Sequence, residues 1–372
     1  GLLFPFNNSL ILFSVLIFCL AVASAINVYP EKLPIKNFSF NDSAKHALGL
    51  AAASLAFSVG ALALLSFGFK IYLADVYAKQ SLAAQDVEAR VEKLNKAISF
   101  FPYYDAYYVS LANGFMALAN KEANGGRDQD KISEYAEMAI GSGKKAVDLS
   151  GAKASNSESL ALVYENASFY RKGTLELAEA LYKKVMELEP QNPSANFRLA
   201  LIEMARADAA NDEKGKTDYI NKAIKRYDEA IAKKPDLADA YYGKTIAYKK
   251  LNNMDEAITQ LEKANSFAPN VDYSFELGSF YFNRGVAQTN ISPEETGGGI
   301  AARNNDINNA EKMFLNIITA VPNHANARYS LALLYKKIGE NDKTREMVKW
   351  LLENLQTEQE KQAVREQFPG LY

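Results

Sequence analysis

The segment ADAYYGKTIAYKKLNNMDEAITQLEKANSFAP, residues 238–269, predicts two antiparallel helices that end at a proline. Ala257 and Ala264 are small enough to let the two helices touch, while the larger residues fill the space between this hairpin and its neighbours. Pro269 ends the second helix because proline has no backbone N–H with which to continue it. The segment therefore predicts one helical hairpin.

The same pattern recurs along the chain with a regular spacing. Pro235 and Pro269 are 34 residues apart, Pro190 lies 45 residues before Pro235, and Pro322 lies 53 residues after Pro269. The two longer spacings equal one period plus insertions of 11 and 19 residues. Small residues also recur at matching places before the end of each unit: Ala97, Ala139, Ala146, Ala178, Ala223, Ala230 and Ala310. A period of this length is typical of helical repeat proteins.

The hairpin resembles the tetratricopeptide-repeat family. Aligned on Pro269, the residues at the signature places of the family are Tyr241, Tyr248, Ala257, Leu261 and Ala264. The resemblance covers roughly residues 71–355 and implies an all-α, right-handed solenoid of about seven hairpins. The polar, helix-forming stretch within residues 356–372 is expected to cap the open end of the solenoid.

Three insertions interrupt the period, at Asn120–Asp130, Ala207–Thr217 and Gln288–Asp306. Each falls between the first and the second helix of a predicted hairpin. Equivalent loops of a solenoid emerge along one edge, so we expect these three segments to form loops on the same side.

The N-terminal region, residues 1–72, predicts two transmembrane helices at about residues 2–26 and 47–70. No charged residue occurs between Gly1 and Pro30, and crossing the hydrocarbon core takes about 20 helical residues. A secretory signal peptide is the alternative for the first run, because Ala23-Ser-Ala25 resembles a cleavage site. The second run, residues 47–69, is rich in small residues and has 23 uncharged positions, and its alternative is a buried helix of a soluble protein.

The second predicted span continues without a break into the first repeat. This junction, together with the sequence KAISFFPYYDAYYVSLANGFMALAN at residues 96–120, resembles the C-terminal end of bacterial O-antigen ligase-like membrane proteins that carry repeat tails. The resemblance covers about residues 1–120 and implies the non-catalytic tail of a truncated glycan-transferring enzyme. It also implies a bacterial inner-membrane location with an extracytoplasmic solenoid. Gly1 in place of methionine agrees with a processed or truncated chain.

Composition argues against several other functions. Charged residues make up 23% of the chain and the net charge is −2, so nothing indicates a nucleic-acid partner. The two histidines, His46 and His324, are far apart in the sequence, and Cys19 is the single cysteine. These residues form no metal motif and no nucleophile–base pair. We therefore expect no cofactor and no metal, and any catalysis would lie in a missing N-terminal part.

The predicted partner-binding groove lies on the first helices of the hairpins. Its residues are Val109, Asn113, Phe197, Leu201, Tyr242, Lys249, Phe280, Asn283, Tyr329 and Lys336. The apolar, tyrosine-rich character of this set favours an extended peptide or a helix of a protein partner, with the lipid bilayer as a second partner. Stacking of a glycan on the tyrosines is another possibility. The alternative is that several of these aromatic residues pack between repeats.

Overall fold

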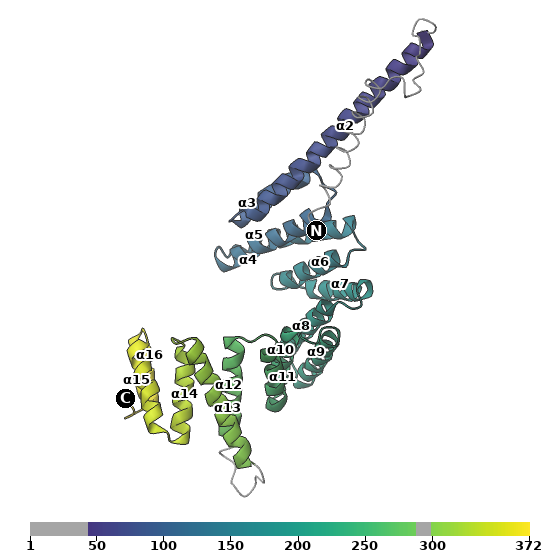
Figure 1. Cartoon of the computed structure of the whole chain (residues 1–372). Helices are drawn as coiled ribbons and strands as arrows, with labels where there is room; N and C mark the ends of the chain where they lie inside the picture. The colour runs from purple at the N-terminus through teal and green to yellow at the C-terminus, as the bar shows by residue number, and fades with distance from the viewer. Residues whose placement is uncertain (1–43, 288–298) are drawn as a thin grey trace, which may run out of the picture. The chain divides into compact units, whose positions relative to one another are not determined.

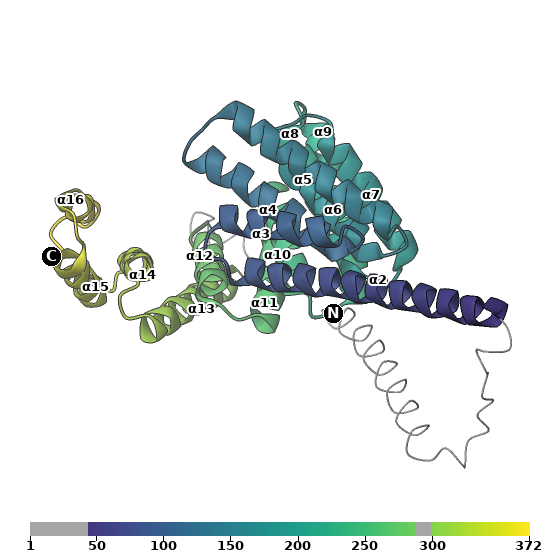
Figure 2. The ribbon, with the colours of Figure 1, turned by 90° about the horizontal axis from the view of Figure 1, so that it is seen from above.

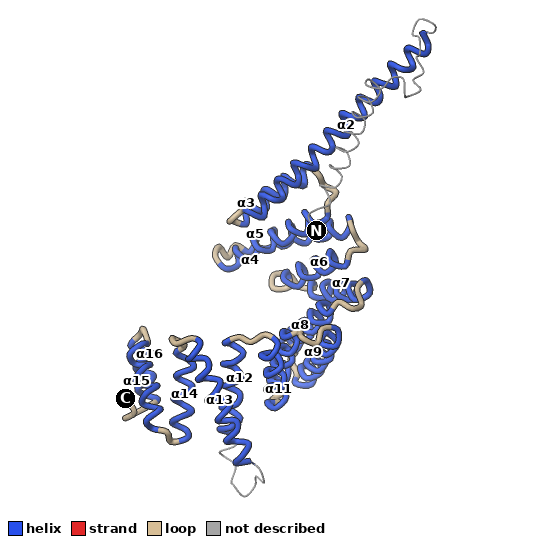
Figure 3. The backbone as a smooth tube through the Cα atoms, in the orientation of Figure 1, coloured by secondary structure: helices blue, strands red, loops and turns tan. Residues whose placement is uncertain are grey.

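The computed structural model describes residues 44–287 and 299–372, and every regular element in these two ranges is an α-helix (Figures 1 and 3). This confirms the all-α class. The chain divides into two compact units, Gly1–Leu188 and Glu189–Tyr372. The first predicted span, residues 2–26, lies outside the described residues.

From residue 44 onward, the first unit contains three helical hairpins. They pair α2 (Ala44–Ala83) with α3 (Val87–Phe100), α4 (Asp105–Asn124) with α5 (Gln129–Leu149), and α6 (Ala154–Ala167) with α7 (Thr174–Leu188). Each hairpin packs on the next through the contacts of α3 with α4 and of α5 with α6.

The described residues of the second unit form four hairpins and a terminal helix. The hairpins pair α8 (Pro193–Ala209) with α9 (Glu213–Lys233), α10 (Ala238–Lys250) with α11 (Met254–Phe267), α12 (Val271–Ala287) with α13 (Gly299–Ala320), and α14 (Ala325–Ile338) with α15 (Asn341–Asn354). The terminal helix is α16 (Glu358–Gln367), which packs on α15.

The regularly spaced prolines end their helices in the same way. The second helices of five hairpins end two residues before a proline: Phe100 before Pro102, Leu188 before Pro190, Lys233 before Pro235, Phe267 before Pro269, and Ala320 before Pro322. The pyrrolidine ring disfavours helical geometry at the preceding residue, so each helix ends before that residue.

The recurring alanines lie where the helices of the hairpins touch. The following residues are fully buried at 0% exposure: Ala97, Ala139, Ala146, Ala178, Ala223, Ala230, Ala257, Ala264 and Ala310. A larger side chain at these contacts would push the helices apart, because protein interiors are close-packed. The placement of the alanines therefore sets the close approach of the paired helices.

The insertions lengthen helices instead of forming long loops. The hairpin of α10 and α11 has helices of 13 and 14 residues, whereas α4 and α5 have 20 and 21. In the α8–α9 hairpin the helices have 17 and 21 residues, with residues 210–212 between them. The expectation that the first and second insertions form long loops was wrong, because most of their residues continue the hydrogen-bonded backbone of the flanking helices. Most of the third insertion, residues 288–298, lies outside the described residues.

Helix α2 is much longer than the helix of a single repeat. It has 40 residues, which corresponds to about 60 Å at the α-helical rise. Its C-terminal part packs on α3 through Ala74, Ala78 and Ser81, which are buried. Its N-terminal part runs past α3 as a straight rod (Figure 2).

Among the described residues, one helix is long and apolar enough to cross a membrane, and it is the segment Ala51–Ala83 of α2. None of its most apolar 18-residue window is buried inside the structure. The alternative of a core helix of a soluble protein does not fit this exposure. Of the two spans expected from the sequence, the described residues therefore contain one candidate.

Candidate functional site

The first helices of the hairpins carry all ten residues of the predicted groove. Val109 and Asn113 lie on α4 of the first unit, and the other eight lie on α8, α10, α12 and α14 of the second unit. In the second unit, four of the residues form two tyrosine–lysine pairs, each spaced seven residues apart along one helix. A spacing of seven places both side chains on one face of a helix.

The first pair, Tyr242 and Lys249 on α10, is held by Glu276 of α12. The Tyr242 hydroxyl donates to Glu276 Oε2 at 3.0 Å, and Lys249 Nζ lies 3.4 Å from Glu276 Oε1. The Tyr242 ring also stacks on Tyr273, with 4.7 Å between centroids, and Lys249 Nζ lies 5.3 Å from the centre of the Phe280 ring. These contacts join the first helices of two consecutive hairpins.

Partial burial and the neighbouring carboxylate change the acidity of Tyr242. Desolvation and then the charge of Glu276 raise the pKa of the Tyr242 hydroxyl to about 12. The phenol therefore stays neutral and remains a hydrogen-bond donor at ordinary pH.

The second pair, Tyr329 and Lys336 on α14, contacts the end of α16. The rings of Tyr329 and Phe368 meet edge to face at 5.8 Å, and Phe368 is fully buried. Lys336 Nζ donates to the carbonyl oxygen of Gln367 at 2.5 Å. The C-terminal end of α16 and the following Phe368 therefore contact the face of α14 that the sequence assigned to a partner.

The remaining residues of the predicted groove differ in exposure. Phe280 is only 4% exposed and lies in the core of the second unit. Phe197 and Leu201 are partly buried against the core between α8 and α9, where the Phe197 ring lies 5.9 Å from that of Tyr227. Two members, Asn113 and Asn283, are exposed. The accessible part of this surface is thus more polar than the sequence suggested.

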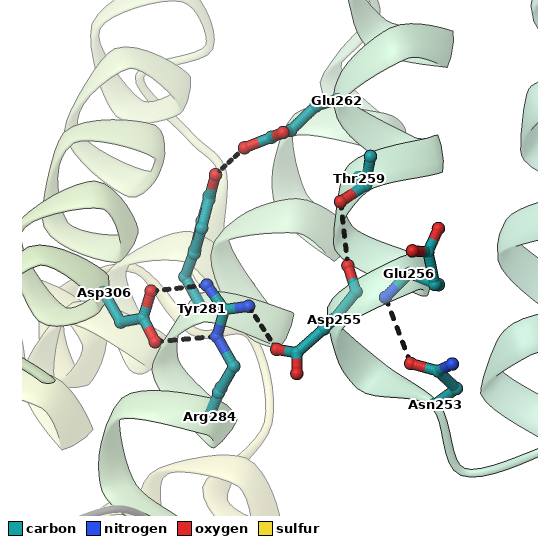
Figure 4. Close-up of polar contacts among 8 residues, drawn as sticks. All are labelled: Asn253, Asp255, Glu256, Thr259, Glu262, Tyr281, Arg284 and Asp306. Carbon is teal, nitrogen blue, oxygen red and sulfur yellow. Dashed lines mark hydrogen bonds and ion pairs between the residues drawn. The ribbon is translucent and has the colours of Figure 1, made fainter. Parts of the chain in front are cut away.

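Arg284 joins three helices near this surface (Figure 4). Its guanidinium donates to both carboxylate oxygens of Asp306 on α13, at 2.8 and 2.7 Å, and to Asp255 Oδ1 on α11 at 2.7 Å. Hydrogen bonds from Arg284 to Asp306 hold the pKa of the guanidinium above its ordinary value. Asp306 is 4% exposed, so its charge is buried and depends on this partner.

A second polar contact lies beside Arg284. The Tyr281 hydroxyl donates to Glu262 Oε1 of α11 (Figure 4). Burial and then this hydrogen bond raise the pKa of the Tyr281 hydroxyl above its ordinary value. Together the two contacts fix α11 against α12, so this polar cluster is part of the joint between hairpins.

Sequence analysis did not identify Arg284, Asp306 or Glu276. Asp306 is the last residue of the third insertion, and the repeat period cannot be used to align residues within an insertion. Glu276 lies one position before Leu277, on a helix whose sequence is notable mainly for its aromatic residues. Searching for opposite charges three or four positions apart along one helix would not have identified these residues, because their partners lie on other helices.

Two surface cavities lie between helices. One, of about 220 Å³, is lined by residues of α5 to α7 that include Lys144, Arg171 and Leu177. The other, of about 360 Å³, lies among α8, α9 and α10, and its lining includes Lys250, which forms an ion pair with Asp208. Within the described part of the chain, no group of three His, Cys, Asp or Glu side chains could hold a metal ion.

Comparison with known proteins identifies one repeat directly. Residues 238–271 match the family model of the tetratricopeptide repeat. This range contains α10 and α11 and the tyrosine–lysine pair that Glu276 holds. The chain therefore carries a tetratricopeptide repeat at the place where the spacing of alanines and prolines predicted it.

Three solved structures illustrate the similarity. YrrB, described as a tetratricopeptide-repeat protein with an unusual peptide-binding site, is 16% identical, with 60% of this chain and 97% of YrrB covered and a TM-score of 0.43. PilF of Pseudomonas aeruginosa is 12% identical, with coverages of 69% and 97% and a TM-score of 0.42. A thermophilic repeat protein of Thermus thermophilus is 14% identical, with coverages of 60% and 98% and a TM-score of 0.39.

Proposed function

We propose that this chain is a membrane-anchored scaffold whose helical repeats bind a partner protein. The observation that carries the proposal is that one continuous helix, α2, contains both a candidate membrane span and part of the repeat array. The N-terminal part of α2 is apolar and exposed, while its C-terminal part is the first helix of the first hairpin. A matched tetratricopeptide repeat in the second unit supports the binding function, because exposed helical faces in such arrays suit extended peptides or helices.

The partner would contact the first helices through their accessible polar residues. Asn113, Asn283, Lys249 and Lys336 are exposed. Tyr242 supplies a partly buried ring edge beside Lys249, whereas the Tyr329 ring already contacts Phe368 at the end of α16. A glycan could use the same ring edge, but the exposed amides and ammonium groups suit backbone carbonyls and acidic side chains of a protein better.

Site-specific photo-crosslinking in intact cells tests the binding function. A photoreactive residue replaces Asn283 on the first helix α12, and the matched control replaces Lys349, which is exposed on the second helix α15. We expect the Asn283 position to capture a defined protein partner that the Lys349 position does not. Equal capture at both positions, or none at Asn283, would contradict binding on the first helices.

A second candidate function is the non-catalytic tail of an O-antigen ligase-like, glycan-transferring membrane enzyme. The observation that favours it is the unbroken helix α2, which leaves no flexible tether between the apolar segment and the first hairpin. The test is to read the gene upstream of the codon for Gly1. Further membrane spans followed by an extracytoplasmic loop are expected, and a stop codon immediately upstream would refute this candidate.

For the location, we propose the inner membrane of a bacterium with the repeats on the extracytoplasmic side. An impermeant lysine reagent applied to cells with a permeable outer layer should label Lys249 and Lys336, because both are exposed. Labelling that requires disruption of the inner membrane would place the repeats in the cytoplasm instead.

A further inference from the structure

The turn between α3 and α4 meets the apolar part of α2. Phe101 lies in this turn, and its ring contacts the Phe67 ring edge to face at 6.0 Å between centroids. Phe67 lies two positions before the end of the uncharged run, which stops at Lys70. The turn that joins the first hairpin to the second therefore reaches the level at which the apolar segment ends.

Five aromatic residues gather at this level, and we name them the aromatic collar: Phe67, Phe69, Tyr72, Phe101 and Tyr103. Phe69 stacks on Tyr72 at 6.5 Å, and Phe101 meets Tyr103 edge to face at 5.7 Å. Exposure is high, at 69% for Tyr103, 60% for Phe69 and 56% for Tyr72. The five side chains therefore form two groups of ring contacts, Phe67–Phe101–Tyr103 and Phe69–Tyr72, at the level where the uncharged run ends. Exposed aromatic clusters of this kind mark a contact with another phase or partner.

The position of the aromatic collar along α2 indicates the occupant. Twenty helical residues ending at Phe69 span about 30 Å, which is the thickness of the hydrocarbon core. Phe67 to Tyr72 then lie at the boundary between hydrocarbon and headgroups, where tyrosine is enriched because its ring is apolar and its hydroxyl is polar. Lys70 follows at once, with an ammonium that reaches the headgroups.

We propose that the aromatic collar inserts into the interfacial zone of a phospholipid bilayer and seats the first hairpin on the membrane surface. This inference rests on the proposed membrane anchoring of α2. It adds a second contact, made by the α3–α4 turn, whose collar residues lie 29 to 36 positions beyond those of α2. The occupant is lipid and not protein, because the collar continues the uncharged surface of the same helix.

Fluorescence quenching by brominated phospholipids tests the inference on the full chain in vesicles. Trp350 is the single tryptophan, so Trp350→Phe provides a silent background. Tyr103→Trp then reports on the collar, Phe57→Trp reports on the middle of the apolar segment, and Phe169→Trp is the matched control. Phe57 and Phe169 are 73% and 82% exposed, and Phe169 lies between α6 and α7, beyond the α3 helix that packs on α2.

With lipids brominated near the headgroup, the Tyr103→Trp variant is expected to lose most of its emission and to shift to the blue. The Phe57→Trp variant should be quenched more by lipids brominated deep in the chains, and the Phe169→Trp variant by neither. Quenching at position 57 without quenching at position 103 would overturn the seating and leave the anchoring intact. No quenching at either position, with the chain absent from floated vesicles, would overturn both.

Discussion

Gly243 on α10 faces the Tyr227 ring of α9, and adding one methyl group there should destabilise the second unit. A Cβ atom at position 243 would lie 2.3 Å from Tyr227 Cζ, 2.5 Å from Cε1 and 2.6 Å from the hydroxyl oxygen. Carbon atoms in contact lie about 3.5–4.0 Å apart, so α9 and α10 must separate by roughly 1 Å. Tyr227 is 1% exposed, so its ring has no room to move aside.

The magnitude follows from two opposing terms. Alanine favours a helix interior over glycine by about 1 kcal/mol, whereas overpacking of a core costs about 1–3 kcal/mol. The added Cβ lies about 1 Å too close to a rigid ring, so the overpacking cost is expected at the upper end of this range, about 3 kcal/mol. Subtracting the gain of about 1 kcal/mol in helix propensity, Gly243→Ala should lower the local stability of the α9–α10 contact by about 2 kcal/mol. This corresponds to amide exchange roughly 30-fold faster in these helices.

Hydrogen exchange of the full chain, read peptide by peptide, measures this effect. The matched control is Gly141→Ala in the middle of α5, where nothing lies within 4 Å of the added Cβ atom. The control should slow exchange in α5, because only the propensity term of about 0.5–1 kcal/mol remains. In a Tyr227→Leu background, Gly243→Ala should no longer accelerate exchange. Unchanged or slower exchange of α9 and α10 in the single Gly243→Ala variant would refute the reasoning.

Further predictions concern the polar joint, the apolar helix and alkaline pH. Arg284→Met should cost about 3 kcal/mol by leaving the Asp306 charge buried without a partner, and adding Asp306→Leu should restore most of the loss in urea unfolding. Val59→Lys should reduce vesicle flotation, because a charge at the middle of a span costs about 2.5–3.5 kcal/mol, whereas Leu82→Lys, beyond the uncharged run, should not. Since the pKa of Tyr242 is raised to about 12, its contribution to stability is complete below about pH 10 and is lost as the pH rises through about 12. The helical circular dichroism signal and the tyrosinate absorbance should change together over this pH interval. If the Tyr242→Phe variant showed the same pH profile as the original chain, the loss of stability would not come from ionisation of Tyr242.

The sequence was sufficient to predict the hairpins because their geometry depends on local rules. Pro269 and Pro235 stop helices by steric exclusion, and Ala257 and Ala264 permit close contact, so each acts independently of distant residues. The family match at residues 238–271 confirms the repeat that was read from this pattern.

The candidate site was less predictable because it depends on contacts between hairpins. Position along a first helix does not reveal that Glu276 engages both Tyr242 and Lys249, or that α16 packs beside Tyr329. The insertions were equally ambiguous, since extra residues between two helices can form a loop or extend both helices. In α4 and α5 the inserted residues extend the helices, and only the helical backbone of the structure reveals this.

Under the proposed anchoring, the unbroken length of α2 would make the first hairpin mechanically sensitive to the bilayer. A helix without a hinge turns as one lever, so a change in tilt inside the membrane is passed directly to the helix that packs on α3. For an immersed length of about 30 Å, a tilt change of about 10° moves the emerging end sideways by about 5 Å. Bilayers of different thickness favour different tilts, so lipid thickness would set the angle at which the repeats are presented to their partner.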